Sequence, residues 1–159
     1  MHKLKRVIHL NRTSLSNLAY KNVLIMELLD ILPAQFEQEL EKKMKLLSDK
    51  DVEFQNEFII HISQVALEGR VNYVIYVPII KPYQPDNEFD FRSYWILTDC
   101  IQTRVKGKKN ISSLNNAMYE LQDFAKEYEF SIISPFYFIF KHNDDTEWIE
   151  VKAKVFDES

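Results

Sequence analysis

The chain has 159 residues, enough for one domain with a hydrophobic core. Its 24 Asp and Glu outweigh its 20 Lys and Arg, and the resulting formal charge of −4 argues against binding to a nucleic-acid backbone. No apolar run approaches the roughly 20 residues needed to span a bilayer, and the N-terminus lacks the features of a signal peptide. We therefore expect a cytoplasmic protein without direct membrane insertion.

The first 30 residues carry mixed signals. Residues 4–10 mix basic and apolar side chains and predict a strand, whereas residues 11–17 are rich in Ser, Thr and Asn and predict a loop or turn. The apolar run at 23–29 fits either a strand or the approach to a helix, because periodicity cannot separate the two at this length.

A helix followed by a hairpin completes the first half. Apolar residues at helical spacing predict a helix over 33–48, with Asp30 as its cap and Pro33 in its first turn. Two β-rich runs, 58–67 and 72–80, are separated by a Gly-containing turn and predict an antiparallel hairpin.

The second half follows a linker at 81–88 that holds two prolines. Alternation predicts a strand from residue 91, and a clean apolar stripe predicts a helix over 113–129. Strands over 136–142 and 147–156 complete the order. In the last of them, one face carries Ile149, Val151, Ala153 and Val155, and the other carries Trp148, Glu150, Lys152 and Lys154.

The two halves correspond in the order of their elements. Each presents a strand, a helix and two further strands, which predicts an α+β fold built by duplication, with a mainly antiparallel sheet and two main helices. We interpret the chain as a single domain over 1–159, with pseudo-repeats at about 1–80 and 89–157 joined by residues 81–88.

The amino-acid sequence contains no recognisable catalytic or cofactor-binding motif. Gly69 and Gly107 are the only glycines, too few for a phosphate-binding loop. The four histidines have no metal-ligand spacing, and His61 is interpreted as a hydrogen-bonded core or edge residue. Cys100 fits a small buried thiol, and the basic cluster at 104–109 a solvated hairpin or loop. We expect neither enzymatic activity nor a metal or cofactor.

Aromatic residues and one acid supply the candidate binding residues. By strand parity Glu147 faces inward, where it could meet a cationic ligand in an aromatic pocket formed with Tyr94, Tyr137 or Trp148. Alternatively, Glu147 is a solvated carboxylate at the end of a strand. Trp95 is a further candidate binding residue, with an alternative interpretation as a core residue, and Trp148, beside mixed charges, is interpreted as a partly exposed anchor for a protein partner.

Four stretches resemble the DUF5085 family of Firmicutes, namely residues 18–23, 91–96, 103–105 and 134–138, and the likeness extends over nearly the whole chain. That family resembles EsaE-type accessory proteins of type VII secretion. The resemblance implies a cytosolic, non-enzymatic adaptor or chaperone that binds a secreted toxin and delivers it to the membrane ATPase. The duplicated order also resembles the GyrI-like (SHS2-duplication) superfamily. That resemblance implies the alternative function, an effector-binding sensor for hydrophobic cations.

Overall fold

The computed structural model describes residues 13–106 and 111–159. The chain forms two compact units: a central unit of residues 20–95, and a terminal unit of residues 1–19 together with 96–159. Within the described ranges, no helix is long and apolar enough to cross a membrane.

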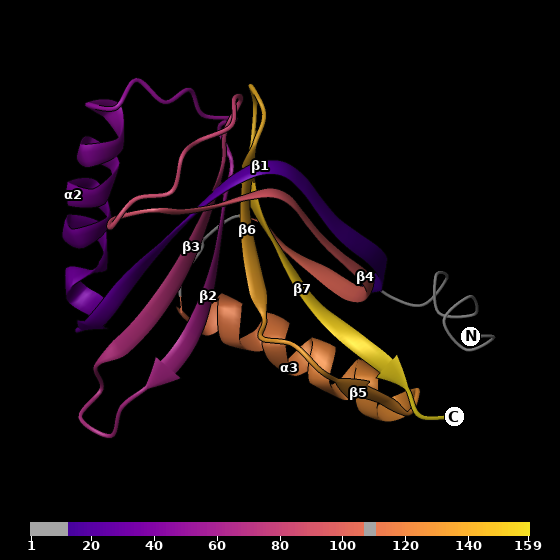
Figure 1. Cartoon of the computed structure of the whole chain (residues 1–159). Helices are drawn as coiled ribbons and strands as arrows, with labels where there is room; N and C mark the ends of the chain where they lie inside the picture. The colour runs from indigo at the N-terminus through magenta and orange to yellow at the C-terminus, as the bar shows by residue number, and fades with distance from the viewer. Residues whose placement is uncertain (1–12, 107–110) are drawn as a thin grey trace. The chain divides into compact units, whose positions relative to one another are not determined.

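The central unit contains most of the first half of the chain. Its elements are β1 (Ser14–Ile31, which begins in the terminal unit), the 3₁₀ turn η2 (Pro33–Gln35), α2 (Phe36–Ser48), β2 (Phe58–Val65), β3 (Val71–Pro78) and the start of β4 (Asp90–Lys106). β3 pairs antiparallel with β1 on one side and with β2 on the other (Figure 1). Ile75 of β3 therefore lies opposite both Met26 and Ile60, in a row of buried apolar side chains.

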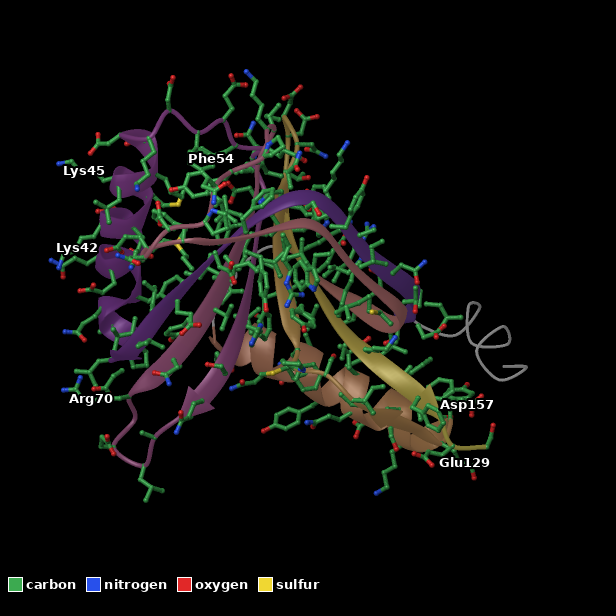
Figure 2. All side chains as sticks on the ribbon, in the orientation of Figure 1. Lys42, Lys45, Phe54, Arg70, Glu129 and Asp157 are labelled. Atoms are coloured by element: carbon green, nitrogen blue, oxygen red, sulfur yellow. The ribbon has the colours of Figure 1, made fainter. Side chains whose placement is uncertain are left out.

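Helix α2 has one apolar and one charged side. The ring of Phe36 lies 4.7 Å from that of Tyr73 on β3, and Leu47 is fully buried. Lys42 and Lys45 project from the side of α2 that faces away from the strands of this unit (Figure 2). The amphipathic spacing thus anchors the helix through its apolar stripe and leaves Lys42 and Lys45 in solvent.

The terminal unit repeats this order. It contains the later part of β4, α3 (Ile111–Glu127), β5 (Phe130–Ile132), β6 (Tyr137–His142) and β7 (Glu147–Asp157). β7 pairs antiparallel with β4, β6 and β5. One face of these strands packs with α3 in a core cluster that includes Ile101, Val105, Leu121, Phe124, Phe138, Ile149 and Val151.

The predicted fold class is confirmed. Each half of the chain presents a strand, a helix and an antiparallel pair of strands, to which the second half adds the short strand β5. The helices fall at 36–48 and 111–127, close to the predicted ranges. The ambiguous run at 23–29 is a strand, because its residues pair with β3. Tertiary pairing decides what the local pattern left open.

Two expectations for the N-terminal part are wrong. The predicted loop at 11–17 overlaps β1, which already begins at Ser14; the predicted strand at 4–10 lies outside the described residues. Asp30 does not cap the helix, because β1 continues through Ile31. Asp30 instead lies at a register shift in β1 with φ 56°, a left-handed conformation that Asp tolerates better than most residues. The helical segment starts after Leu32, whose N–H donates to Gln35 Oε1 at 3.0 Å.

The predicted linker at 81–88 is irregular and is held by one carboxylate. Asp86 accepts hydrogen bonds from the Tyr83 hydroxyl, from Lys50 Nζ at 2.9 Å and from the Phe89 N–H at 2.9 Å. Tyr83 and then Lys50 hold the pKa of Asp86 well below its usual range. The linker is thereby tied to Lys50, two residues beyond the C-terminal end of α2.

Candidate ligand-binding site

The sheet of the terminal unit has a polar face, on the side that α3 does not cover. Its side chains alternate with those of the apolar core along three strands. The strand register aligns them in three rows: Lys106, Trp148 and Lys141; Arg104, Glu150 and Ile139; Gln102, Lys152 and Tyr137. We call these nine residues the polar face.

Glu150 is the centre of the polar face. Its side chain is only 6% exposed, and one of its oxygens accepts a hydrogen bond from Trp148 Nε1 at 3.2 Å. The carboxylate oxygens lie 3.5 Å from Arg104 Nη2, 3.7 Å from Lys141 Nζ and 3.8 Å from Lys152 Nζ. Burial of a carboxylate is costly unless opposite charges compensate it, and here three cationic groups do so.

Lysine and amide side chains connect the polar face to the first residues of β1. Lys152 Nζ donates to Ser16 Oγ at 2.9 Å and to the Asn17 carbonyl at 2.7 Å. Gln102 Nε2 donates to Ser14 Oγ at 3.1 Å. The first residues of β1 are thus held against β4 and β7 by side-chain hydrogen bonds.

A cavity of about 490 Å³ opens beside these residues, lined by Ser14, Gln102, Thr103, Arg104 and Lys106. Small-molecule sites usually measure about 300–1,000 Å³, so the volume suits a small ligand. The guanidinium of Arg104 lies 5.9 Å from the centre of the Trp148 ring and is 52% exposed. Arg104 is therefore positioned by an acid and an indole while keeping access to the cavity.

Three of the five predicted site residues lie in the terminal unit. Tyr137 and Trp148 belong to the polar face, Tyr137 buried and Trp148 half-buried. Parity places Glu147 on the same strand face as Ile149, but the expected inward pocket is not found there among the described residues. Glu147 is exposed, because it is the first residue of β7 and pairs with the last residue of β6, His142. The alternative interpretation, a solvated carboxylate at a strand end, describes its surroundings.

The other two predicted residues lie in the central unit. Trp95 is buried, and its ring stacks at 4.0 Å on Tyr76 and at 6.2 Å on Tyr20. Its interpretation as a core residue is confirmed. Tyr94, its neighbour on the opposite face of β4, is exposed.

The interpretations of His61 and Cys100 are also confirmed. His61 Nδ1 lies 3.0 Å from the Tyr76 hydroxyl, and its burial lowers the pKa of the imidazole. Cys100 is fully buried. Burial raises the pKa of its thiol, although Lys152 and Lys154 act in the opposite direction, so the thiol stays protonated at neutral pH. Within the described part of the chain, no group of three or more His, Cys, Asp or Glu could hold a metal ion.

Four residues of the site were missed from the sequence: Arg104, Lys141, Glu150 and Lys152. The pattern placed Glu150 and Lys152 correctly on the polar side of the last strand but gave no sign that both are buried. Arg104 was assigned to a solvated loop, whereas β4 continues to Lys106; residues 107–110 lie outside the description. The available signal was an acid two residues before a lysine on the polar side of the last strand, Glu150 and Lys152.

Comparison with solved structures confirms the GyrI-like fold. The EcmrR C-terminal domain matches with a TM-score of 0.71 and 9% sequence identity, over 93% of this chain and 99% of that chain. EcmrR in a complex with DNA matches with a TM-score of 0.69 and 11% identity, over 97% of this chain and 60% of the EcmrR chain. A hydrolase from Listeria innocua matches with a TM-score of 0.52 and 11% identity, over 96% of each chain. Identities this low show a shared fold alone.

Sequence comparison gives the family. No curated protein matches the chain. The model of DUF5085, a domain of unknown function, matches residues 19–157, which is most of the sequence. The chain belongs to the DUF5085 family.

Proposed function

We propose that this protein is an effector-binding domain that holds a small molecule without transforming it. The observation that carries the proposal is the arrangement of Arg104, Glu150 and Trp148 beside a cavity of about 490 Å³. A buried carboxylate with three cationic partners is costly to build, and a well-packed apolar face is often as stable or more stable. Such a group beside a cavity is more typical of a binding site than of a purely structural face.

The geometry favours binding over catalysis. Arg104 and Lys106 line the cavity together with the polar side chains of Ser14 and Gln102, whereas the hydroxyl of the fully buried Thr103 donates to Glu120. These groups can orient a ligand through charge and hydrogen bonds. Neither cation is paired with a nucleophile and a base in a reactive arrangement among the described lining residues. The likeness to a hydrolase at 11% identity makes hydrolysis the outcome against which the proposal is tested.

The test is a thermal-shift screen of the full chain against a panel of hydrophobic cations and organic anions. A ligand of the native state raises the melting temperature because binding adds stability that grows with the logarithm of the ligand concentration, about 2.7 kcal/mol at 100 times its Kd. We expect at least one compound to give a concentration-dependent shift that Arg104→Ala or Trp148→Ala removes. Arg92→Ala is the matched control, since Arg92 is an exposed arginine of β4 in the central unit.

Mass spectrometry of the bound compound completes this experiment. Recovery of the compound unchanged supports a binding domain. No shift with any panel member, or conversion of the ligand during incubation, contradicts the proposal.

The second candidate is the toxin adaptor of type VII secretion implied by the family resemblance. It is favoured by the β2–β3 hairpin, which exposes the apolar side chains of Ile62, Val65 and Leu67. Exposed apolar residues at a loop tip are suited to contact with a protein partner.

Co-expression with the toxin encoded nearest to this gene, followed by pull-down, tests the adaptor hypothesis. We expect a complex that Val65→Ser and Leu67→Ser weaken. Ile133→Ser serves as the control because Ile133 is a similarly exposed apolar residue of the terminal unit. If all three variants give the same yield of complex, the hairpin is not part of the interface. If the chain forms a complex with none of the neighbouring toxins, the adaptor function is contradicted.

A further inference from the structure

We propose that the cavity of the terminal unit takes an organic anion, a small molecule bearing a carboxylate or phosphate group, and not a hydrophobic cation. The inference rests on the proposed function, since it names the class of ligand for that same site. Three features carry it: the charge balance of the polar face, the groups that line the cavity, and the positioning of Arg104.

The polar face is basic although the protein is acidic. It carries four cationic side chains, Arg104, Lys106, Lys141 and Lys152, against one carboxylate, Glu150, which leaves an excess of three positive charges. The whole chain has a formal charge of −4. Positive charge is therefore concentrated on this face, and such a concentration raises the local population of anions.

Glu150 is already compensated. Its carboxylate lies within 3.8 Å of three cationic nitrogens and accepts the indole N–H of Trp148. A cationic ligand would have to compete with these partners for the same oxygens. No carboxylate lines the cavity among its described residues. A cationic ligand would therefore find no negative charge there and would be repelled by Arg104 and Lys106.

Arg104 can bind an anion while keeping its partner. One guanidinium nitrogen, Nη2, lies 3.5 Å from Glu150, and the side chain remains 52% exposed at the cavity wall. The planar guanidinium has five N–H donors in a fixed arrangement that suits carboxylate and phosphate oxygens. Glu150 and Trp148 hold this group in place, which lowers the entropy lost when a ligand binds.

Two further groups at the cavity can donate hydrogen bonds to the same anion. Lys106 supplies a second charge, and it lies two residues from Arg104 on the same face of β4. The Ser14 oxygen accepts a hydrogen bond from Gln102, and its hydroxyl hydrogen can still point to a ligand. The cavity thus offers two cations and a hydroxyl donor to one bound group.

The test compares two probes that share a ring and differ in charge: naphthalene-2-carboxylate and naphthalen-2-ylmethylammonium. Isothermal titration of each into the full chain gives the two dissociation constants. We expect the carboxylate to bind at least ten-fold more tightly than the ammonium probe. Inorganic phosphate is titrated as a third arm, and binding as tight as that of the naphthoate would indicate a site for free inorganic anions.

Variants locate the binding. Arg104→Gln is expected to weaken naphthoate binding at least ten-fold, and Lys106→Gln to weaken it by a smaller factor, while Arg92→Gln leaves it unchanged. Circular dichroism and the urea midpoint establish that each variant is folded. Lys106→Gln provides an independent measurement if Arg104→Gln does not fold, because the ion pairs of Glu150 are made with Arg104, Lys141 and Lys152 and do not involve Lys106.

The outcomes separate the inference from the proposed function. Tighter binding of the ammonium probe overturns the inference and leaves the binding function intact. Naphthoate binding that is indifferent to both variants overturns it as well, since the anion would then lie elsewhere. If neither probe binds, the inference fails, whereas the proposed function still stands as long as another member of the thermal-shift panel binds and is recovered unchanged.

Discussion

Replacement of Glu150 by Gln is expected to lower the free energy of unfolding by about 3–5 kcal/mol, the cost of removing one partner from a buried ion pair. The Glu150 side chain is 6% exposed and that of Lys152 is 10% exposed, so the lysine would keep its charge in a site with little water. The more exposed Arg104 and Lys141 can turn to solvent and contribute less to the loss. Urea denaturation followed by circular dichroism measures the effect.

Two further variants isolate the charge from the hydrogen bond. Gln keeps a side-chain oxygen that can accept the Trp148 N–H, so the loss in Glu150→Gln reports the charge. Glu147→Gln, at an exposed position three residues earlier on β7, should change stability by less than about 0.5 kcal/mol. The double variant Glu150→Gln, Lys152→Met should recover part of the loss, because the uncompensated lysine is gone. If Glu150→Gln has the same free energy of unfolding as the wild type, then the three cations are stabilised by water and do not depend on the carboxylate.

The fold was accessible from the sequence because its signals are local. The apolar stripe of α3 and the alternation along β7 each lie within one element, and they fixed both the helix and the inward side of the strand. Val151, predicted on the apolar face, is indeed in the core cluster under α3. The start of β1 was missed for the opposite reason. Ser14, Ser16 and Asn17 are residues typical of loops, and their place beside β4 and β7 depends on hydrogen bonds to Gln102 and Lys152, more than 80 residues away.

The candidate site was less accessible because charge pairing depends on strand register. Arg104 and Glu150 lie opposite each other only because β4 and β7 pair with one particular alignment, and a shift of one residue would place one of them in the core. The alternation of side chains along the last strand predicted that Glu147 faces inward. Alternation does not show how far the covering helix extends along the strand, and Glu147 is exposed. The sequence therefore predicted Trp148 and Tyr137 as site residues, and both lie on the polar face. It did not identify the charged residues of that face, such as Glu150 and Lys152.

The same cluster connects stability with binding. Glu150 and Trp148 fix the guanidinium of Arg104 before any ligand arrives, and that arrangement requires burying a carboxylate. A protein selected for stability alone could fill this face with apolar side chains. The arrangement of three cations around one acid suits the anion site that we propose: the acid would orient the arginine, and the surplus of positive charge would remain for the ligand.

Replacement of Leu121 by Ala is expected to lower the free energy of unfolding by about 2–5 kcal/mol, through lost burial and the cavity left behind. Leu121 lies on α3, is fully buried, and belongs to the cluster that includes Ile101 and Val151. Leu47 of α2 is equally buried in the central unit, so Leu47→Ala should cost a similar amount. Leu46, its neighbour on the same helix, is 41% exposed, and Leu46→Ala is therefore the matched control with an effect below about 1 kcal/mol.

Calorimetry of the two core variants also tests how the units unfold. If both units unfold in one cooperative transition, Leu121→Ala and Leu47→Ala shift the same single peak by similar amounts. If the units unfold separately, each variant lowers one of two peaks and leaves the other in place. A loss in Leu121→Ala no larger than that in Leu46→Ala would contradict the placement of α3 on the apolar face of β4, β6 and β7. The polar face would then lose its assignment too, because it is defined as the side of that sheet opposite to α3.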